Sequence, residues 1–142
     1  MMRLCACLGV GLDIIEPCGF PWDERKIRRS GMDYIEHVDL VRHGSWEKFV
    51  DAYLPPLEGG GLKEGGKRLV LLTTKTDTSY TRFTFTESDI LIAGRESSGV
   101  PDDVHNAVTA RVTIPMAGAT RSLNVVNATA MIVGEALRQL AG

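Results

Sequence analysis

The sequence predicts an α/β domain with a parallel sheet, and two observations lead to this prediction. Short apolar runs alternate along the chain with segments of helical periodicity, which is typical of layered α/β domains. Two of these runs, Leu69–Leu72 and Ile90–Ala93, are apolar at every position, as expected for parallel strands covered on both faces. A chain of 142 residues is expected to form a single domain over residues 1–142.

The strands are predicted from their apolar runs. The clearest ones lie at Leu12–Ile15, Arg68–Thr74, Asp89–Ala93 and Arg111–Pro115. A weaker strand is predicted near Tyr34–Val38.

The helices are predicted from periodicity and from their end signals. They are expected at Met1–Leu8, Asp23–Ser30, Ser45–Leu54, Asp102–Val108 and Asn124–Leu140. Ser45 can cap the third of them, and Pro101 lies near the start of the fourth. The glycine-rich, charged segment Pro55–Lys67 cannot pack and is expected to be a flexible surface insertion.

The first half of the last helix has almost no polar face. A helix that is apolar all round must be buried on several sides. In so small a domain, the additional burial is expected to come from a second copy of the chain, so the sequence predicts a homodimer. The apolar positions are Val125, Val126, Ala128, Ala130, Met131, Ile132 and Val133.

Net charge, cysteine spacing and the length of apolar runs narrow the class of protein. The formal net charge is −2, so any contact with RNA must come from a local basic patch. No Cys/His set has zinc spacing, and Cys5, Cys7 and Cys18 are interpreted as small buried thiols, with a metal site as the weaker alternative. Because no apolar run of 18 residues and no signal peptide are present, a cytoplasmic protein is expected.

Three loops follow predicted strands, and ligands in open α/β sheets bind beyond the carboxyl ends of the strands. The loops are Thr73–Lys75, Gly94–Pro101 and the segment from Ile114 to Asn124. Taken singly, a glycine-bracketed loop can equally be a tight turn. The P-loop and dinucleotide fingerprints are absent from the sequence, which disfavours phosphate-cradling nucleotide chemistry.

Together these loops resemble motifs two and three of the SPOUT, or SpoU-type, RNA ribose 2′-O-methyltransferases. The motifs are Gly94-x-Glu96-x-x-Gly99-x-Pro101, Ile114-Pro115-Met116 and Ser122-Leu123-Asn124 at the start of a helix. Further stretches are similar to the bacterial enzymes that methylate the tRNA wobble nucleotide, and the resemblance spans nearly the whole chain. These stretches are Ile14–Pro17, Arg28–Tyr34, Leu72–Lys75 and Glu135–Gln139.

The resemblance implies a trefoil knot in the C-terminal half and a bent S-adenosylmethionine held by the knot loops. It places the cofactor contacts on Leu72, Gly94, Ile114, Ser122 and Leu123. Chemistry agrees with part of this assignment, because a glycine at position 94 allows close approach to the backbone. The sulfonium of the cofactor supplies the leaving group, so no metal or covalent nucleophile is expected.

Three further residues are assigned catalytic roles by the resemblance. Arg3 is expected to position the target hydroxyl and the adjacent phosphate, since arginine is a poor base. Glu96 is expected to orient Arg3 or to fix its own loop, and Asn124 to cap the last helix and tie the third loop. For Glu96 and Asn124, purely structural capping is the alternative.

The expected substrate is tRNA, bound through local cations. Without the resemblance, the basic cluster from Arg25 to Arg29 would be interpreted as a solvated helix face. His37, His43 and His105 have no spacing that suggests a catalytic triad and are interpreted as surface or RNA-rim residues. The predicted RNA contacts are Arg25, Lys26, Arg28, Arg29, Arg42 and Arg121.

The sequence departs from the family pattern in two places. Family members carry a strand and a proline/asparagine/glycine-rich loop before the position of Arg3, so we expect an N-terminally truncated form that is poorly active or unstable. Gly134 stands where many relatives have tyrosine. Alternatives to a wobble-nucleotide enzyme are a SPOUT methyltransferase with another tRNA or rRNA target and a non-catalytic RNA-binding or cofactor-binding remnant.

Overall fold

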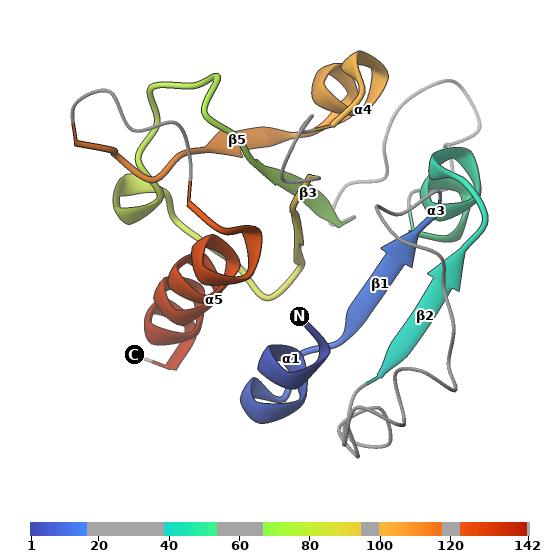
Figure 1. Cartoon of the computed structure of the whole chain (residues 1–142), viewed down its shortest axis with the longest axis horizontal. Helices are drawn as coiled ribbons and strands as arrows, with labels where there is room; N and C mark the ends of the chain where they lie inside the picture. Colours follow the sequence, from blue (N-terminus) through green and yellow to red (C-terminus); the bar gives the residue numbers. More distant parts are fainter. Residues whose placement is uncertain (17–38, 54–66, 95–99, 118–122, 142) are drawn as a thin grey trace. The chain divides into compact units, whose positions relative to one another are not determined.

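A computed structural model describes residues 1–16, 39–53, 67–94, 100–117 and 123–141. The chain divides into two compact units, Met1–Pro56 and Leu57–Gly142. Each unit has a parallel sheet with helices (Figure 1), which confirms the predicted α/β class. The single domain over the whole chain stays a prediction.

The first unit begins with α1 (Met2–Leu8), the helix predicted at this place. It ends because Gly9 adopts a left-handed conformation, with φ 68°, which glycine reaches without steric strain. In this conformation the amides of Gly9 and Val10 donate to the carbonyls of Ala6 and Cys5, so the last turn of the helix is capped.

The sheet of the first unit pairs β1 (Leu12–Ile15) in parallel with β2 (Leu40–His43), with Leu12 opposite Leu40 and Ile15 opposite His43. The sequence did not predict a strand at Leu40–His43, and the strand predicted near Tyr34–Val38 lies outside the described residues. Helix α3 (Trp46–Tyr53) follows β2, and Ser45 caps it as expected, because its Oγ accepts from the Lys48 amide at 3.2 Å.

The surface position expected for His43 is wrong: the residue is buried, because Asp13 of the neighbouring strand satisfies its ring. Its Nε2 lies 2.7 Å from Asp13 Oδ2, and its ring meets Phe49 and Tyr53 edge-on. The Asp13 carboxylate also accepts a hydrogen bond from Tyr53, which together with burial raises the pKa of the Tyr53 phenol to about 12. This network connects β1, β2 and the end of α3.

The second unit contains a three-stranded parallel sheet in the order β4-β3-β5 (Figure 1). Strand β3 (Arg68–Leu72) lies in the middle, β4 (Asp89–Ile92) on one side and β5 (Ala110–Val112) on the other. The chain therefore crosses β3 on its way from β4 to β5. The strands predicted to reach Thr74 and Pro115 are shorter in the structure, and the chain turns after Leu72 and Val112.

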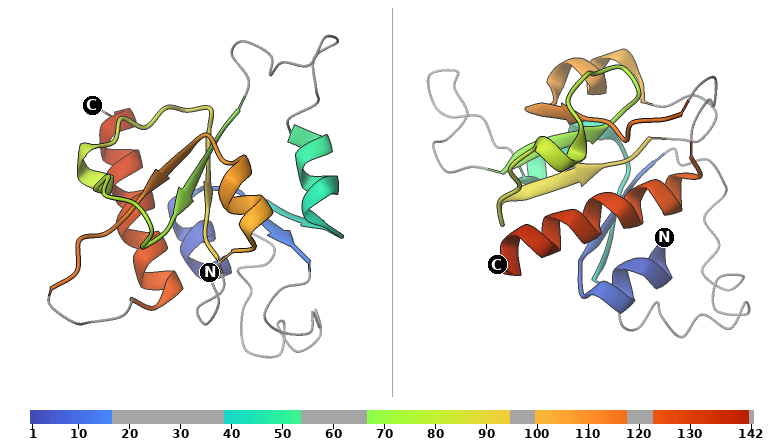
Figure 2. Two further views of the ribbon diagram at one scale, coloured as in Figure 1. Left: turned by 90° about the horizontal axis from the view of Figure 1, so that it is seen from above. Right: turned by 90° about the vertical axis from the view of Figure 1, so that its left-hand side faces the viewer.

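Helices cover both faces of this sheet, and Figure 2 shows α4 (Asp102–Ala107) and α5 (Val125–Ala141) on opposite sides. The alternation along β3 explains the arrangement, because Val70 faces α5 while Leu69 and Leu71 point the other way. The core between the sheet and α5 consists of Val70, Phe85, Val112, Ile114, Ala128 and Ile132.

The last two predicted helices are present in the structure, and two other predicted segments lie wholly or almost wholly outside its described part. The helices predicted at Asp102–Val108 and Asn124–Leu140 are confirmed within one residue at each end. A short 3-10 helix, η2 (Tyr80–Arg82), lies between β3 and β4. The helix predicted at Asp23–Ser30 and nearly all of the insertion at Pro55–Lys67 lie outside the described residues.

Candidate functional site

The carboxyl ends of the three strands of the second unit lie at one edge of the sheet. In the register, Leu71 is opposite Ile92, and Leu72 is opposite Val112. This register determines where three of the predicted cofactor residues lie. Leu72 ends β3, Gly94 comes two residues after β4, and Ile114 comes two residues after β5. Parallel pairing therefore brings three residues that are far apart in sequence to the same edge.

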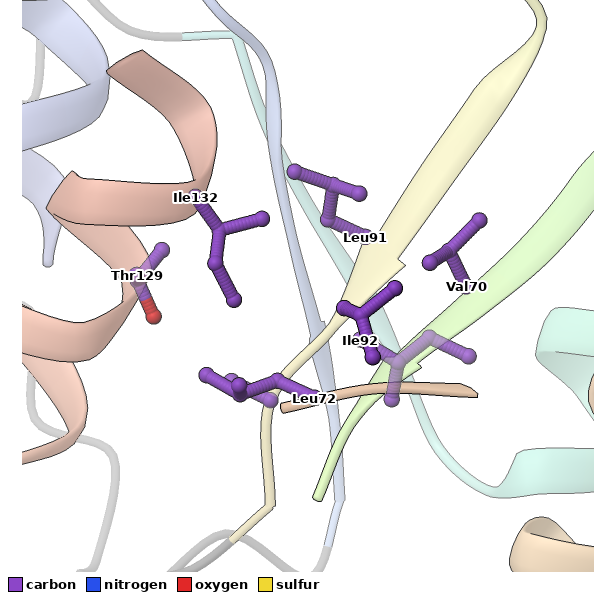
Figure 3. Close-up of a pocket in the computed structure, with 8 residues that line it drawn as sticks. Val70, Leu72, Leu91, Ile92, Thr129 and Ile132 are labelled. Atoms are coloured by element: carbon purple, nitrogen blue, oxygen red, sulfur yellow. The ribbon is translucent and has the colours of Figure 1, made fainter. Parts of the chain in front are cut away.

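A small apolar hollow of about 20 Å³ lies between this part of the sheet and α5 (Figure 3). Leu72 lines this hollow, and so does Ala93, the residue directly before Gly94. Thr129 is the one polar residue of the lining, and its hydroxyl donates a hydrogen bond to the Val125 carbonyl at 2.7 Å. This edge of the sheet therefore offers an apolar wall, which suits contact with an apolar group and not with a charged one. The lining residues are Val70, Leu72, Leu91, Ile92, Ala93, Val112, Thr129 and Ile132.

The other predicted cofactor residues differ in exposure. Ile114 is buried in the core against α5, so it supports the wall at this edge of the sheet. Leu123 is 40% exposed and lies just before α5. Ser122 lies outside the described residues.

Asn124 is the N-cap of α5, as the sequence predicts. Its side-chain Oδ1 accepts hydrogen bonds from the amides of Val126 at 2.9 Å and Asn127 at 3.3 Å. Both amides belong to the first turn of α5, whose N–H groups have no carbonyl acceptor within the helix. The cap fixes where the third predicted loop enters α5.

Gln139 holds the far end of α5 to the rest of the unit, which sequence reasoning missed. Its side-chain amide donates to the Phe83 carbonyl at 2.9 Å, and its Oε1 accepts from the Phe85 amide at 2.8 Å. The side chain thus satisfies two backbone groups of one extended segment. The only sequence signal was that Gln139 belongs to a stretch similar to the family.

The Glu135 carboxylate neighbours this anchor. It accepts from Arg138 Nη2 at 2.7 Å and from Gln139 at 3.0 Å. These two hydrogen bonds lower the pKa of Glu135 to about 2. The carboxylate is therefore ionised at neutral pH, and it orients the Gln139 amide toward Phe83.

At the opposite edge of the sheet, Arg68 and Asp89 join the first residues of β3 and β4. Arg68 Nε lies 2.6 Å from Asp89 Oδ1, and its Nη2 lies 2.8 Å from Oδ2. Burial raises the pKa of Asp89, but hydrogen bonds from Arg68 and Thr86 outweigh this, so the pKa lies below its usual value. This pair holds the register on which the carboxyl-edge site depends.

Two of the predicted site residues lie in the described part of the first unit. Arg3 is exposed on α1. Arg42, in β2, forms an ion pair with Glu16, to which its Nε donates at 3.0 Å. An RNA phosphate at Arg42 would therefore compete with a carboxylate.

The structure leaves several predicted site residues outside its described part. They are the catalytic candidate Glu96, the cofactor candidate Ser122 and the RNA candidates Arg25, Lys26, Arg28, Arg29 and Arg121. Among the described residues, no cluster of three His, Cys, Asp or Glu side chains could hold a metal ion. No helix in the described segments is long and apolar enough to cross a membrane.

Comparison with known proteins identifies the family. The model of the SpoU rRNA methylase family matches residues 1–134. The chain belongs to this family. The resemblance stated from the motifs is thereby confirmed, and the α/β fold with its carboxyl-edge loops is that of a SpoU-family protein.

Relatives of this SpoU-family chain are similar over nearly its full length. The tRNA (cytidine(34)-2′-O)-methyltransferase of Beijerinckia indica subsp. indica is 53% identical over 140 residues, which cover 99% of this chain and 82% of the relative. The protein of the same name from Escherichia coli strain K12 is 37% identical and covers 99% of this chain and 83% of the relative.

Solved structures give the same result. One that addresses 2-OH methylation of C/U34 on tRNA has a TM-score of 0.83 and 37% identity, and the match covers 99% of this chain and 86% of that one. The SpoU methyltransferase AviRb from Streptomyces viridochromogenes, in complex with the cofactor AdoMet, has a TM-score of 0.78 and 27% identity, with 99% and 55% covered.

Proposed function

We propose that this SpoU-family chain transfers a methyl group from S-adenosylmethionine to the ribose 2′-hydroxyl of the tRNA wobble nucleotide, a cytidine or a modified uridine. The observation that carries the proposal is the 53% identity with a tRNA (cytidine(34)-2′-O)-methyltransferase over almost the entire chain. Enzyme class, RNA substrate and cofactor all agree with the relatives and with the AdoMet complex of AviRb.

Two features of the described site support the cofactor assignment. The wall beside Leu72 is apolar, which suits contact with the adenine ring of the ligand, and Gly94 leaves room for close approach to the backbone. Ile114, Ser122 and Leu123 complete the proposed contacts. When bound, S-adenosylmethionine supplies a methyl group on a sulfonium, which is already an activated donor.

The residues of the chain then have to place the ribose hydroxyl in line with that methyl group. We assign this positioning to Arg3, which also suits a neighbouring phosphate. Glu96 orients Arg3 or fixes its own loop. Asn124 ties the third loop through the cap of α5. RNA binding is assigned to Arg25, Lys26, Arg28, Arg29, Arg42 and Arg121.

Three further features belong to the proposal: the trefoil knot in the C-terminal half, a homodimer and a cytoplasmic location. Support for the knot is family membership. Support for the dimer is the exposed face of α5, where Met131 is 40% exposed and Gly134 has open space around its Cα. Gly134 has no side chain, so a second helix could approach α5 closely at this position.

A methyl-transfer assay tests the proposed function. The purified chain is incubated with S-adenosylmethionine and either unmodified tRNA or the same tRNA with a 2′-deoxynucleotide at the wobble position. We expect a mass increase of one methyl group on the first RNA and none on the second. Equal methylation of both would overturn the ribose assignment, and methylation of rRNA alone would favour another target. Cofactor binding without transfer to any bulk RNA would favour the non-catalytic alternative.

A further inference from the structure

The turn that follows β3 has no role in the proposed function so far. It contains Thr73-Thr74-Lys75, the first of the three loops singled out in the sequence, and continues to Ser79. Because β3 is the middle strand, this turn leaves the sheet between the ends of β4 and β5. It therefore stands at the edge where the cofactor residues gather.

Hydrogen bonds fix the conformation of this turn. At its start, the Thr73 amide donates to the Val112 carbonyl at 3.0 Å, and the Lys75 amide donates to Thr73 Oγ1 at 3.1 Å. At its end, the Thr113 amide donates to the Thr78 carbonyl at 2.8 Å, and the Tyr80 amide donates back to Thr113 at 2.9 Å. Both ends of the turn are thus attached to the strand region of β5, and Lys75 lies in between on a defined support.

Lys75 is exposed, and its ammonium group has no carboxylate within ion-pair distance in the described part of the chain. The ion pairs of the described second unit are Arg68–Asp89 and Arg138–Glu135. Asp77 is exposed in the same turn, so the turn carries no net charge. It offers a single cation beside the exposed hydroxyl residue Thr74, which is a point contact and not a basic patch.

We propose that Lys75 binds a backbone phosphate of the RNA, next to the nucleotide that receives the methyl group. This inference rests on the proposed function. A lysine is suited to a phosphate as a point charge, and hydroxyl side chains are common partners of the same oxygens. The contact would fix the register of the RNA across the carboxyl edge without selecting a base.

The cofactor carboxylate is the competing ligand for this cation. Exposure favours the phosphate, because Lys75 is exposed while the proposed cofactor contacts lie in the apolar wall formed by Leu72 and its neighbours. The two ligands are distinguishable, since only the phosphate contact contributes to the salt dependence of RNA binding.

The test measures equilibrium binding of a labelled anticodon stem-loop at several salt concentrations, with and without S-adenosylmethionine. Lys75→Ala is compared with Lys67→Ala, which removes the same charge from an exposed residue at the opposite edge, just before β3. For Lys75→Ala we expect affinity to fall by roughly threefold to tenfold and the slope of log K against log salt to fall by roughly 0.7 to 0.9. Lys67→Ala should change neither, and Lys75→Arg should restore most of the affinity.

The outcomes separate the inference from the function on which it rests. If the unaltered chain binds the RNA and Lys75→Ala keeps its affinity and salt slope, the phosphate contact is wrong while the function stands. A loss of cofactor affinity with unchanged RNA binding would assign Lys75 to the cofactor carboxylate and overturn the proposal. If the unaltered chain does not bind tRNA, the function and the inference fail together.

Discussion

Asn124 caps the start of α5 and is proposed to tie the third loop of the active site. Asn124→Ala removes the acceptor of the Val126 and Asn127 amides, so we expect a loss of about 1 kcal/mol in the free energy of unfolding. Asn124→Ser keeps a capping oxygen and should retain most of the stability. Both variants should lose methyl transfer. Full activity of Asn124→Ser in the tRNA assay would mean that the residue acts only as a cap.

Asp89 makes stability depend on pH. Its pKa is lowered in the folded chain, so the carboxylate stabilises the fold above its unfolded pKa of about 4, and this contribution is lost as pH falls through the folded value. Asp89→Asn should reduce the free energy of unfolding by roughly 1 to 2 kcal/mol at pH 7, since Arg68 is partly exposed. Urea unfolding should show this difference narrowing below about pH 4, and a difference independent of pH would contradict the account.

At the scale of elements, Asn124 caps the start of α5, and Gln139 attaches its far end to the segment that contains Phe83 and Phe85. Gln139→Ala leaves the Phe83 carbonyl and the Phe85 amide without their partner, and we expect a loss of about 1 to 3 kcal/mol in urea unfolding. Arg138→Ala is the control, because its side chain is 70% exposed and its loss should be much smaller. Equal losses for the two variants would show that the Gln139 hydrogen bonds do not anchor the helix.

The sequence predicts elements where the local pattern determines them. Strands β3 and β4 have continuous apolar runs, and α5 has periodicity with Asn124 as its cap. Strand β2 was missed because it contains Arg42 and His43, and His43 is buried only because Asp13, 30 residues away in sequence, satisfies its ring. Local patterns do not contain such long-range partners.

In the candidate site, too, local patterns identify single residues but not their long-range partners. Leu72, Gly94 and Ile114 could be named because they lie at or just after the ends of apolar strands and belong to a recognisable motif order. That they lie at one edge depends on the order β4-β3-β5, which no local pattern gives. The Arg68–Asp89 pair and the Gln139 anchor join residues distant in sequence, so only the structure reveals them.

For the whole molecule, the account predicts a dimer formed through the exposed face of α5. Met131→Glu places a charge on that face and should shift the mass in analytical ultracentrifugation from dimer toward monomer. Val41→Glu is the matched control, because Val41 is similarly exposed, at 43% compared with 40% for Met131, and should leave the mass unchanged. A monomeric unaltered chain, or a Met131→Glu variant of dimeric mass, would contradict this interface.

The central claim is that S-adenosylmethionine binds at the carboxyl ends of β3, β4 and β5. Titration of the methyl-labelled chain with the cofactor, followed by NMR, tests it most directly. The account predicts that the methyl resonances of Leu72, Ile92 and Ile114 shift together with one dissociation constant, while those of Val41 and Leu140 stay in place. Shifts confined to residues away from this edge, or no shifts at saturating cofactor, would contradict it.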